Sequence, residues 1–90
     1  MSDPFRIDGQ RALVTGANTG IGQAVALGLA ERGAHVIAAG RSSCAETVDL
    51  IKAAGGSAEA FALDLSSDDL AGRIDAAGPL DILVNNAGII

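Results

Sequence analysis

The stretch Thr15-Gly16-Ala17-Asn18-Thr19-Gly20-Ile21-Gly22 contains three glycines. It joins the apolar run Ala12-Leu13-Val14 to an amphipathic helical pattern. Glycines at a strand-to-helix turn permit positive φ and let backbone N–H groups approach an anion. The helix that follows adds the positive end of its dipole, about half an elementary charge. The stretch therefore predicts a cradle for the pyrophosphate of a dinucleotide, with a plain tight turn as the alternative reading. The Gly-Lys-Ser/Thr ending of a phosphoryl-transfer loop is absent.

Strand and helix patterns alternate along the whole chain. Strands are predicted near residues 11–14, 36–39, 58–63 and 82–84, and helices near 21–32 and 45–54, with a short helix from Ser66 through Ile74. Such alternation predicts parallel strands joined by right-handed helical crossovers. We therefore expect an α/β fold, a three-layer, Rossmann-type doubly wound sheet with strand order 3-2-1-4 in this portion.

The first predicted helix carries small and apolar residues at helical spacing. Its face toward the sheet is predicted to comprise Ile21, Ala24, Val25, Gly28 and Leu29. Glycine in the middle of a helix costs about 1 kcal/mol relative to alanine, so a close approach of Gly28 to the sheet is expected as compensation.

Composition excludes several classes of protein. The 90 residues allow one domain at most, and the net charge of −5 with six scattered basic residues argues against nucleic acid. No signal-peptide pattern and no apolar run approaching ~20 residues are found, so a cytoplasmic protein without a membrane segment is expected. Cys44 stands alone, which excludes an internal disulfide and a multi-cysteine metal site; it and His35 are predicted to be structural.

Strands 1 and 4 are neighbours in the predicted order, so their carboxyl ends flank the point where ligands bind in such sheets. The glycine loop and Asn85-Asn86-Ala87-Gly88 are then expected to share one crevice. The strand at 82–84 is also expected to leave an unpaired sheet edge with apolar faces.

At this point the chain resembles the short-chain dehydrogenase/reductase family. The resemblance rests on Thr15-Gly16-x-x-x-Gly20-Ile21-Gly22, on Asp64-Leu65 after the third strand, and on Asp81-Ile82-Leu83-Val84-Asn85-Asn86-Ala87-Gly88. The three motifs occur in family order across nearly the whole chain. Together they imply an NAD(P)-dependent oxidoreductase that transfers a hydride between nicotinamide and a secondary alcohol or ketone.

The resemblance also implies the roles of individual positions. It implies a cofactor-binding set of Gly16, Asn18, Thr19, Gly20, Ile21, Gly22, Arg41, Ser42, Asp64, Leu65, Asn86, Ala87 and Gly88. Within that set the glycine loop would line the pyrophosphate, 64–65 would meet the adenine, and 86–88 would run beside the nicotinamide half. Thr15 would steady the fourth strand near Asn86 through its hydroxyl.

The choice of coenzyme depends on the end of the second strand. NAD-binding members commonly carry an acidic residue there, whereas this chain has Gly40 followed by Arg41. A guanidinium can pair with the 2′-phosphate of NADP. Thr19 argues against NADP, because many NADP-binding members have a second basic residue at that position. On balance the sequence favours NADP over NAD.

The catalytic residues that the family uses, a Tyr-x-x-x-Lys pair with a Ser, are not in this chain, which has no tyrosine. The resemblance implies that residues 1–90 are the N-terminal, cofactor-binding portion of a longer single-domain enzyme, homo-oligomeric and commonly tetrameric when complete. Within the family the chain most resembles sugar-acid dehydrogenases that act on 2-deoxy-D-gluconate or 2-dehydro-3-deoxy-D-gluconate. A noncatalytic nucleotide-binding or redox-sensing module and an interaction domain with a vacant crevice are the alternatives.

Overall fold

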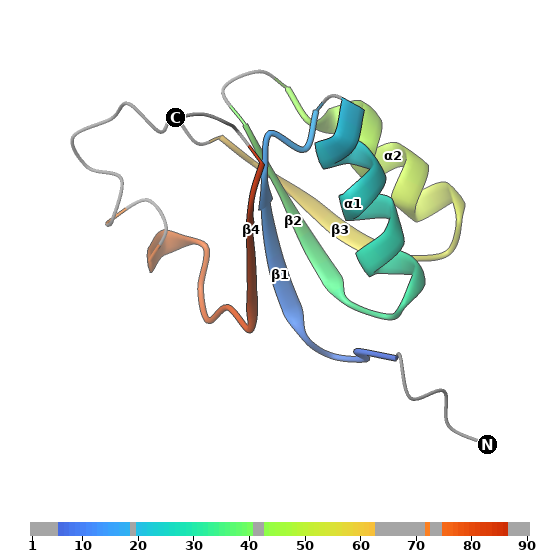
Figure 1. Cartoon of the computed structure of the whole chain (residues 1–90), viewed down its shortest axis with the longest axis horizontal. Helices are drawn as coiled ribbons and strands as arrows, with labels where there is room; N and C mark the ends of the chain where they lie inside the picture. Colours follow the sequence, from blue (N-terminus) through green and yellow to red (C-terminus); the bar gives the residue numbers. More distant parts are fainter. Residues whose placement is uncertain (1–5, 19, 41–42, 63–71, 73–74, 87–90) are drawn as a thin grey trace.

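The chain folds into a parallel sheet with helices between successive strands (Figure 1). This computed structural model describes residues 6–18, 20–40, 43–62, 72 and 75–86. The elements are β1 (Arg11–Thr15), α1 (Gly20–Glu31), β2 (His35–Gly40), α2 (Ala45–Ala53), β3 (Ser57–Ala62) and β4 (Ile82–Asn85). The strand order is β3-β2-β1-β4 with parallel pairing throughout, which confirms the predicted doubly wound topology.

The register of the sheet aligns the carboxyl ends of three strands. Thr15 at the end of β1 pairs with Ala39 of β2 on one side and with Asn85 of β4 on the other. The loop that leaves β1 therefore emerges between the ends of its two neighbours. This register brings the glycine loop and Asn86 to one edge of the sheet, as predicted.

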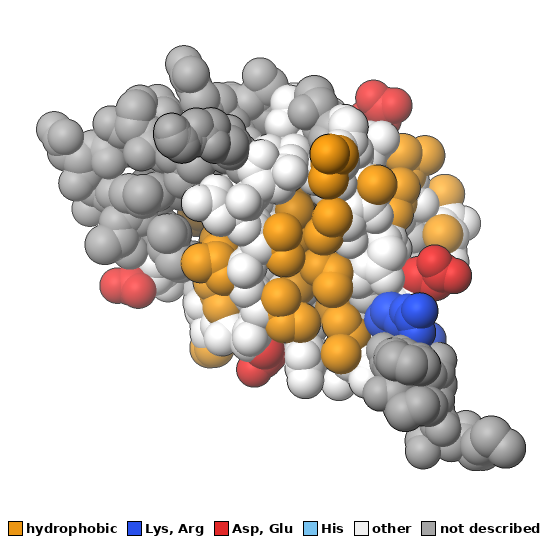
Figure 2. All heavy atoms as spheres, viewed as in Figure 1, with side chains coloured by type: hydrophobic (Ala, Val, Ile, Leu, Met, Phe, Trp, Pro, Cys, Tyr) orange, Lys and Arg blue, Asp and Glu red, His pale blue; other side chains and the backbone are white. Residues whose placement is uncertain are grey.

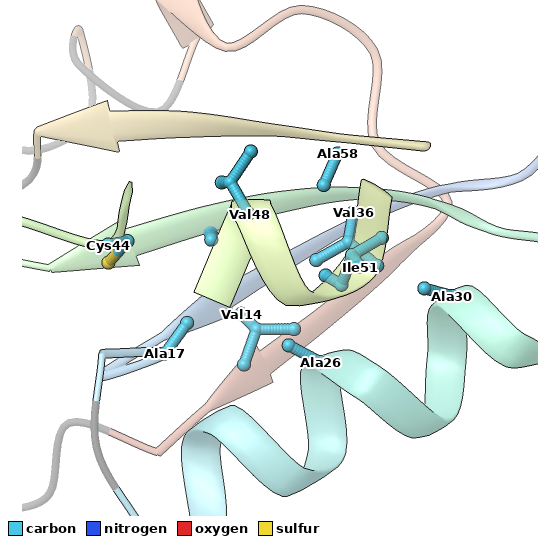
Figure 3. Close-up of a cluster of buried hydrophobic side chains, with 10 residues drawn as sticks. Val14, Ala17, Ala26, Ala30, Val36, Cys44, Val48, Ile51 and Ala58 are labelled. Atoms are coloured by element: carbon cyan, nitrogen blue, oxygen red, sulfur yellow. The ribbon is translucent and has the colours of Figure 1, made fainter. Parts of the chain in front are cut away.

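β1 and β2 are buried on both faces. On one face α1 and α2 pack over Val14 and Val36, with Ala26 and Ile51 as helical partners (Figure 3). On the other face Leu13, Ile37 and Ala39 form a second buried cluster, against which Phe61 and Leu80 pack. Two apolar faces are typical of a covered parallel sheet and explain the unbroken apolar runs in these strands.

The predicted buried face of α1 is wrong. The buried residues of the helix are Gly22, Ala26 and Ala30, whereas Ile21 is 73% exposed. Gly28 is exposed and a Cβ built there would meet nothing within 4 Å, so it does not approach the sheet. The helix lies on the sheet through the smallest side chains available at i, i+4 and i+8, which lets the two backbones come close.

The two outer strands of the described sheet are β3 and β4, as the predicted strand order requires. Glu59 lies on β3, which is an outer strand, where a charge discourages pairing with another molecule. β4 is the other outer strand of the described residues, and Leu83 is 57% exposed. Figure 2 shows hydrophobic side chains gathered on the face that carries α1, where Val25, Leu29 and Val84 are only partly buried. The short helix predicted from Ser66 lies mostly outside the described residues.

Arg11 holds β4 at the amino end of the sheet. Its backbone N–H donates to Asp81 Oδ2 at 2.8 Å, and its guanidinium donates to the carbonyl oxygens of Ala77 and Pro79 at 2.6 and 2.8 Å. The segment that leads into β4 is thereby fixed before the strand begins. The position of Asn86 at the far end of β4 follows from this alignment.

Candidate functional site: the glycine loop at the carboxyl edge

The loop between β1 and α1 takes the backbone conformation that the sequence predicts. Gly16 has φ 65° and Gly20, the first residue of α1, has φ 47°. Residues with a Cβ rarely adopt these positive φ angles, so glycine is needed at both turns of the loop.

Gly22 is required for a different reason, which is close packing. A Cβ at this position would collide with the carbonyl group of Gly16 and would lie 2.6 Å from Asn86 Nδ2. The start of α1, the beginning of the loop and the residue after β4 therefore converge on one point. The missing side chain of Gly22 is what allows them to meet.

Thr15 ties the end of β1 to the end of β4. The backbone N–H of Asn86 donates to Thr15 Oγ1 at 2.9 Å, and the Thr15 hydroxyl donates to Asn85 Oδ1 at 3.0 Å. Thr15 is 4% exposed, so these bonds are largely shielded from water. The contact between the Thr15 hydroxyl and the strand near Asn86 is confirmed.

The middle of the loop is anchored in the protein interior. Ala17 is fully buried, and its N–H donates to the carbonyl oxygen of Ala39 at 3.2 Å. Its own carbonyl oxygen accepts a 2.7 Å hydrogen bond from the hydroxyl of Thr47 on α2. Thr47 was not predicted as part of the site. The available signal was a threonine on the apolar face of the helix, next to Val48 and four residues before Ile51.

The N-terminus of α1 has two features that favour an anion. A Cβ built on Gly20 would meet nothing within 4 Å, so the space beside Gly20 is open. The first turn of α1 contains no acidic residue, so the positive end of its dipole is not neutralised there. The backbone N–H groups of such a helix end suit an anion such as a diphosphate.

The predicted site residues fall into two groups. The loop and strand-end positions Gly16, Asn18, Gly20, Ile21, Gly22 and Asn86 lie at the carboxyl edge of the sheet. The other predicted positions, Thr19, Arg41, Ser42, Asp64, Leu65, Ala87 and Gly88, lie outside the described residues. The cofactor-binding role of both groups remains a prediction.

A hollow of about 650 Å³ lies away from this site. It is lined by the carboxyl-terminal halves of both helices, including Leu27, Ala30 and Ile51, and by Arg6. The negative ends of two helix dipoles border it, which disfavours an anion. The pyrophosphate is therefore expected at the glycine loop, not in this hollow.

Cys44 and His35 have structural positions. Cys44 is 3% exposed within the core cluster, and burial raises the pKa of its thiol, so a reactive thiolate is disfavoured (Figure 3). His35 opens β2 at the opposite end of the sheet and contacts Ser57 Oγ and Glu59 Oε1 on β3. Cys44 belongs to the same buried cluster as Ala17 of the loop, where it packs as a small apolar side chain.

In the part of the chain that the structure describes, no group of three or more His, Cys, Asp and Glu side chains is arranged to hold a metal ion. None of the helices in those same residues has the length and apolar character needed to cross a bilayer.

The glycine loop and the strand-end asparagine occur together in a known family. The family model for short chain dehydrogenases matches residues 10–90. The chain belongs to the short-chain dehydrogenase family. The structure agrees, because its sheet topology brings the glycine loop and Asn86 to the same end of the sheet.

Relatives in this family act on different compounds. The chain is 43% identical over 95 residues to 2-dehydro-3-deoxy-D-gluconate 5-dehydrogenase of Bacillus subtilis, covering 100% of this chain and 37% of that protein. It is 43% identical over 98 residues to versicolorin reductase 1 of Aspergillus parasiticus, again covering 100% of this chain and 37% of the relative. The chain thus spans about a third of the length of the curated relatives it matches.

A solved short-chain dehydrogenase has the same fold with a coenzyme bound. The crystal structure of a proposed 2-deoxy-D-gluconate 3-dehydrogenase from Agrobacterium tumefaciens with bound NADP superposes with a TM-score of 0.88 at 49% identity. The match covers 99% of this chain and 36% of that chain.

Proposed function

We propose that residues 1–90 form the N-terminal, dinucleotide-binding portion of a single-domain NAD(P)-dependent oxidoreductase. The observation that carries the proposal is the convergence at Gly22, where the start of α1 meets the carbonyl of Gly16 and the side chain of Asn86. The open space beside Gly20, at the N-terminus of α1, supports the proposal, because backbone N–H groups at a helix N-terminus can bind a diphosphate. In this proposal the loop from Gly16 to Gly22, with Asn18 and Thr19, binds the pyrophosphate.

The coenzyme is proposed to be NADP in preference to NAD. β2 ends at Gly40, so no carboxylate stands at that position to accept the ribose hydroxyls. Arg41 and Ser42 follow directly and are proposed to contact the 2′-phosphate. The bound NADP of the Agrobacterium tumefaciens relative supports this choice.

The remaining coenzyme contacts are proposed from the family motifs. Asp64 and Leu65 would meet the adenine, and Asn86, Ala87 and Gly88 would run beside the ribose and nicotinamide. When bound, the nicotinamide supplies the hydride acceptor or donor. The ordered end of β4, fixed by Thr15, keeps this half of the site in register with the glycine loop.

The substrate is proposed to be a small secondary alcohol or ketone, specifically a sugar acid such as 2-deoxy-D-gluconate. Two relatives described above carry sugar-acid activities in their names, which supports this class. The versicolorin reductase makes a polyketide-type substrate the alternative. The complete protein is proposed to be a cytoplasmic homo-oligomer, such as a tetramer, that binds neither nucleic acid nor membrane.

The experiment is a turnover assay on the protein at its natural length. Sugar acids and unrelated secondary alcohols are supplied with NADP or NAD, and reduced nicotinamide is followed by its absorbance. Oxidation of a sugar acid faster with NADP than with NAD is the expected result. Coenzyme binding without turnover of any alcohol would favour a noncatalytic nucleotide-binding or redox-sensing module. Absence of coenzyme binding would contradict the proposal altogether.

A further inference from the structure

Thr47 is a polar side chain at the centre of the interface between α2 and the glycine loop. It is 0% exposed, and its hydroxyl donates to the carbonyl oxygen of Ala17 at 2.7 Å. The same hydroxyl oxygen accepts a 3.0 Å hydrogen bond from Gln23 Nε2 on α1. One hydroxyl thus joins the loop to both helices that cover this face of the sheet.

The bond to Thr47 fixes the orientation of a peptide group in the loop. A trans peptide is planar, so the N–H of Asn18 points away from the carbonyl of Ala17. Because Thr47 holds that carbonyl toward α2, the Asn18 N–H is turned away from α2. The N–H of Ala17 is held separately by Ala39, so the peptide groups on both sides of Ala17 are constrained.

Thr47 also links α2 to the glycine loop. It lies in the first turn of α2, which begins at Ala45. Its hydrogen bond to Ala17 holds this turn of the helix against the loop.

We propose that Thr47 is a positioning residue for the dinucleotide site, holding the glycine loop in the conformation that receives the diphosphate. The inference rests on the proposed function, because it concerns the same site. Thr47 does not contact the coenzyme in this account and acts through Ala17. Loss of the Thr47 hydroxyl raises the dissociation constant of the coenzyme and leaves kcat nearly unchanged.

The test compares Thr47→Val with the unaltered protein at its natural length, using NADPH fluorescence titration and steady-state kinetics. Valine keeps the branched shape and removes the hydroxyl. The dissociation constant and the coenzyme KM should rise about tenfold, as for one lost hydrogen bond, with kcat within about twofold. Ile51→Val is the matched control, because Ile51 is 1% exposed on the same helix and does not bond to the loop. This control should lose stability without losing affinity.

Each outcome has a separate meaning. Affinity unchanged in Thr47→Val, or lowered equally in Ile51→Val, would overturn the positioning role while leaving the proposed function intact. An unaltered protein that does not bind NADPH or NADH would overturn both. If Thr47→Val does not fold, Thr47→Ser and Thr47→Ala form a second pair that differs only by the hydroxyl. Serine should retain the affinity and alanine should lose it; equal affinities in the two would again refute the proposal.

Discussion

The backbone N–H of Asn86 donates a 2.9 Å hydrogen bond to the hydroxyl of Thr15, which joins the ends of two parallel strands that are far apart in the sequence. β1 and β4 are also joined by their ladder of four residue pairs from Ala12 to Thr15 and by the hydrogen bonds of Arg11 at the amino end. The Thr15 hydroxyl extends that pairing by one residue beyond the sheet. It places Asn86, near the end of the last family motif, beside the glycine loop.

Thr15→Val should destabilise this edge of the sheet. The substitution leaves the N–H of Asn86 without its partner in a partly buried site, which costs about 1–3 kcal/mol. The free energy of unfolding from urea titration measures the loss. Thr15→Ser keeps the hydroxyl and is expected to lose much less. A loss in Thr15→Ser as large as that in Thr15→Val, which keeps the methyl group, would contradict the dominant role of the hydrogen bond.

Gly22→Ala should remove most of the coenzyme affinity. The new Cβ would overlap the Gly16 carbonyl, and the loop must move because the overlapped oxygen and carbon are backbone atoms. Overpacking of this kind costs about 1–3 kcal/mol, which corresponds to about 5- to 150-fold in affinity where the displaced loop is the one that binds the coenzyme. Calorimetric titration with NADPH measures the change.

Gly28→Ala is the matched control on the same helix. A Cβ at Gly28 meets nothing within 4 Å, so the substitution adds helix propensity without a clash. It should stabilise the fold by about 0.5–1 kcal/mol and leave coenzyme binding unchanged. Loss of affinity in this variant would contradict the assignment of the buried face of α1.

Arg41→Ala should reduce the preference for NADP. One or two charge-assisted hydrogen bonds to a 2′-phosphate correspond to about 10- to 100-fold in the ratio of NADP to NAD affinity. Lys52→Ala removes the same charge from an exposed position at the far end of α2 and should leave the ratio unchanged. An unchanged ratio in Arg41→Ala would refute the assignment of this residue.

Cys44 should be inert in the folded protein. Burial raises the pKa of its thiol, so the neutral form is favoured in the native state. A group whose folded pKa is raised contributes stability below its unfolded pKa and loses it as the pH rises through the folded pKa. Thiol-reagent kinetics should show slow modification in buffer and fast modification in urea. Rapid modification of the native protein would place the thiol outside the core.

The sequence predicted the topology because its strongest local signals agree with one another. The unbroken apolar runs of β1 and β2 indicate strands covered on both faces, and the glycines at 16 and 20 indicate the turn between β1 and α1. The right-handed crossover rule and the doubly wound arrangement of such sheets then give the order 3-2-1-4. The meeting of the loop with Asn86 follows from that order.

The packing of α1 could not be predicted from periodicity. Apolar residues occur on several sides of this helix, so more than one face fits the helical spacing. The face that is buried is the one with the smallest residues, because Gly22 must lie against the Gly16 carbonyl. That requirement comes from the tertiary contact and has no local signature.

Thr47 was missed for a related reason. A threonine within a helix is ordinary in a sequence, and its importance depends on the buried carbonyl of Ala17, thirty residues earlier. Only the fold brings the two together. A polar residue on the apolar face of α2 was the single available indication.

The most direct test of the account is calorimetric titration of the protein at its natural length with NADPH and NADH, repeated with Gly22→Ala and Gly28→Ala. The account predicts saturable binding that is tighter for NADPH, is strongly weakened by Gly22→Ala and is retained by Gly28→Ala. Failure of the unaltered protein to bind either coenzyme, or full binding by Gly22→Ala, would contradict the claim that this glycine loop holds a dinucleotide.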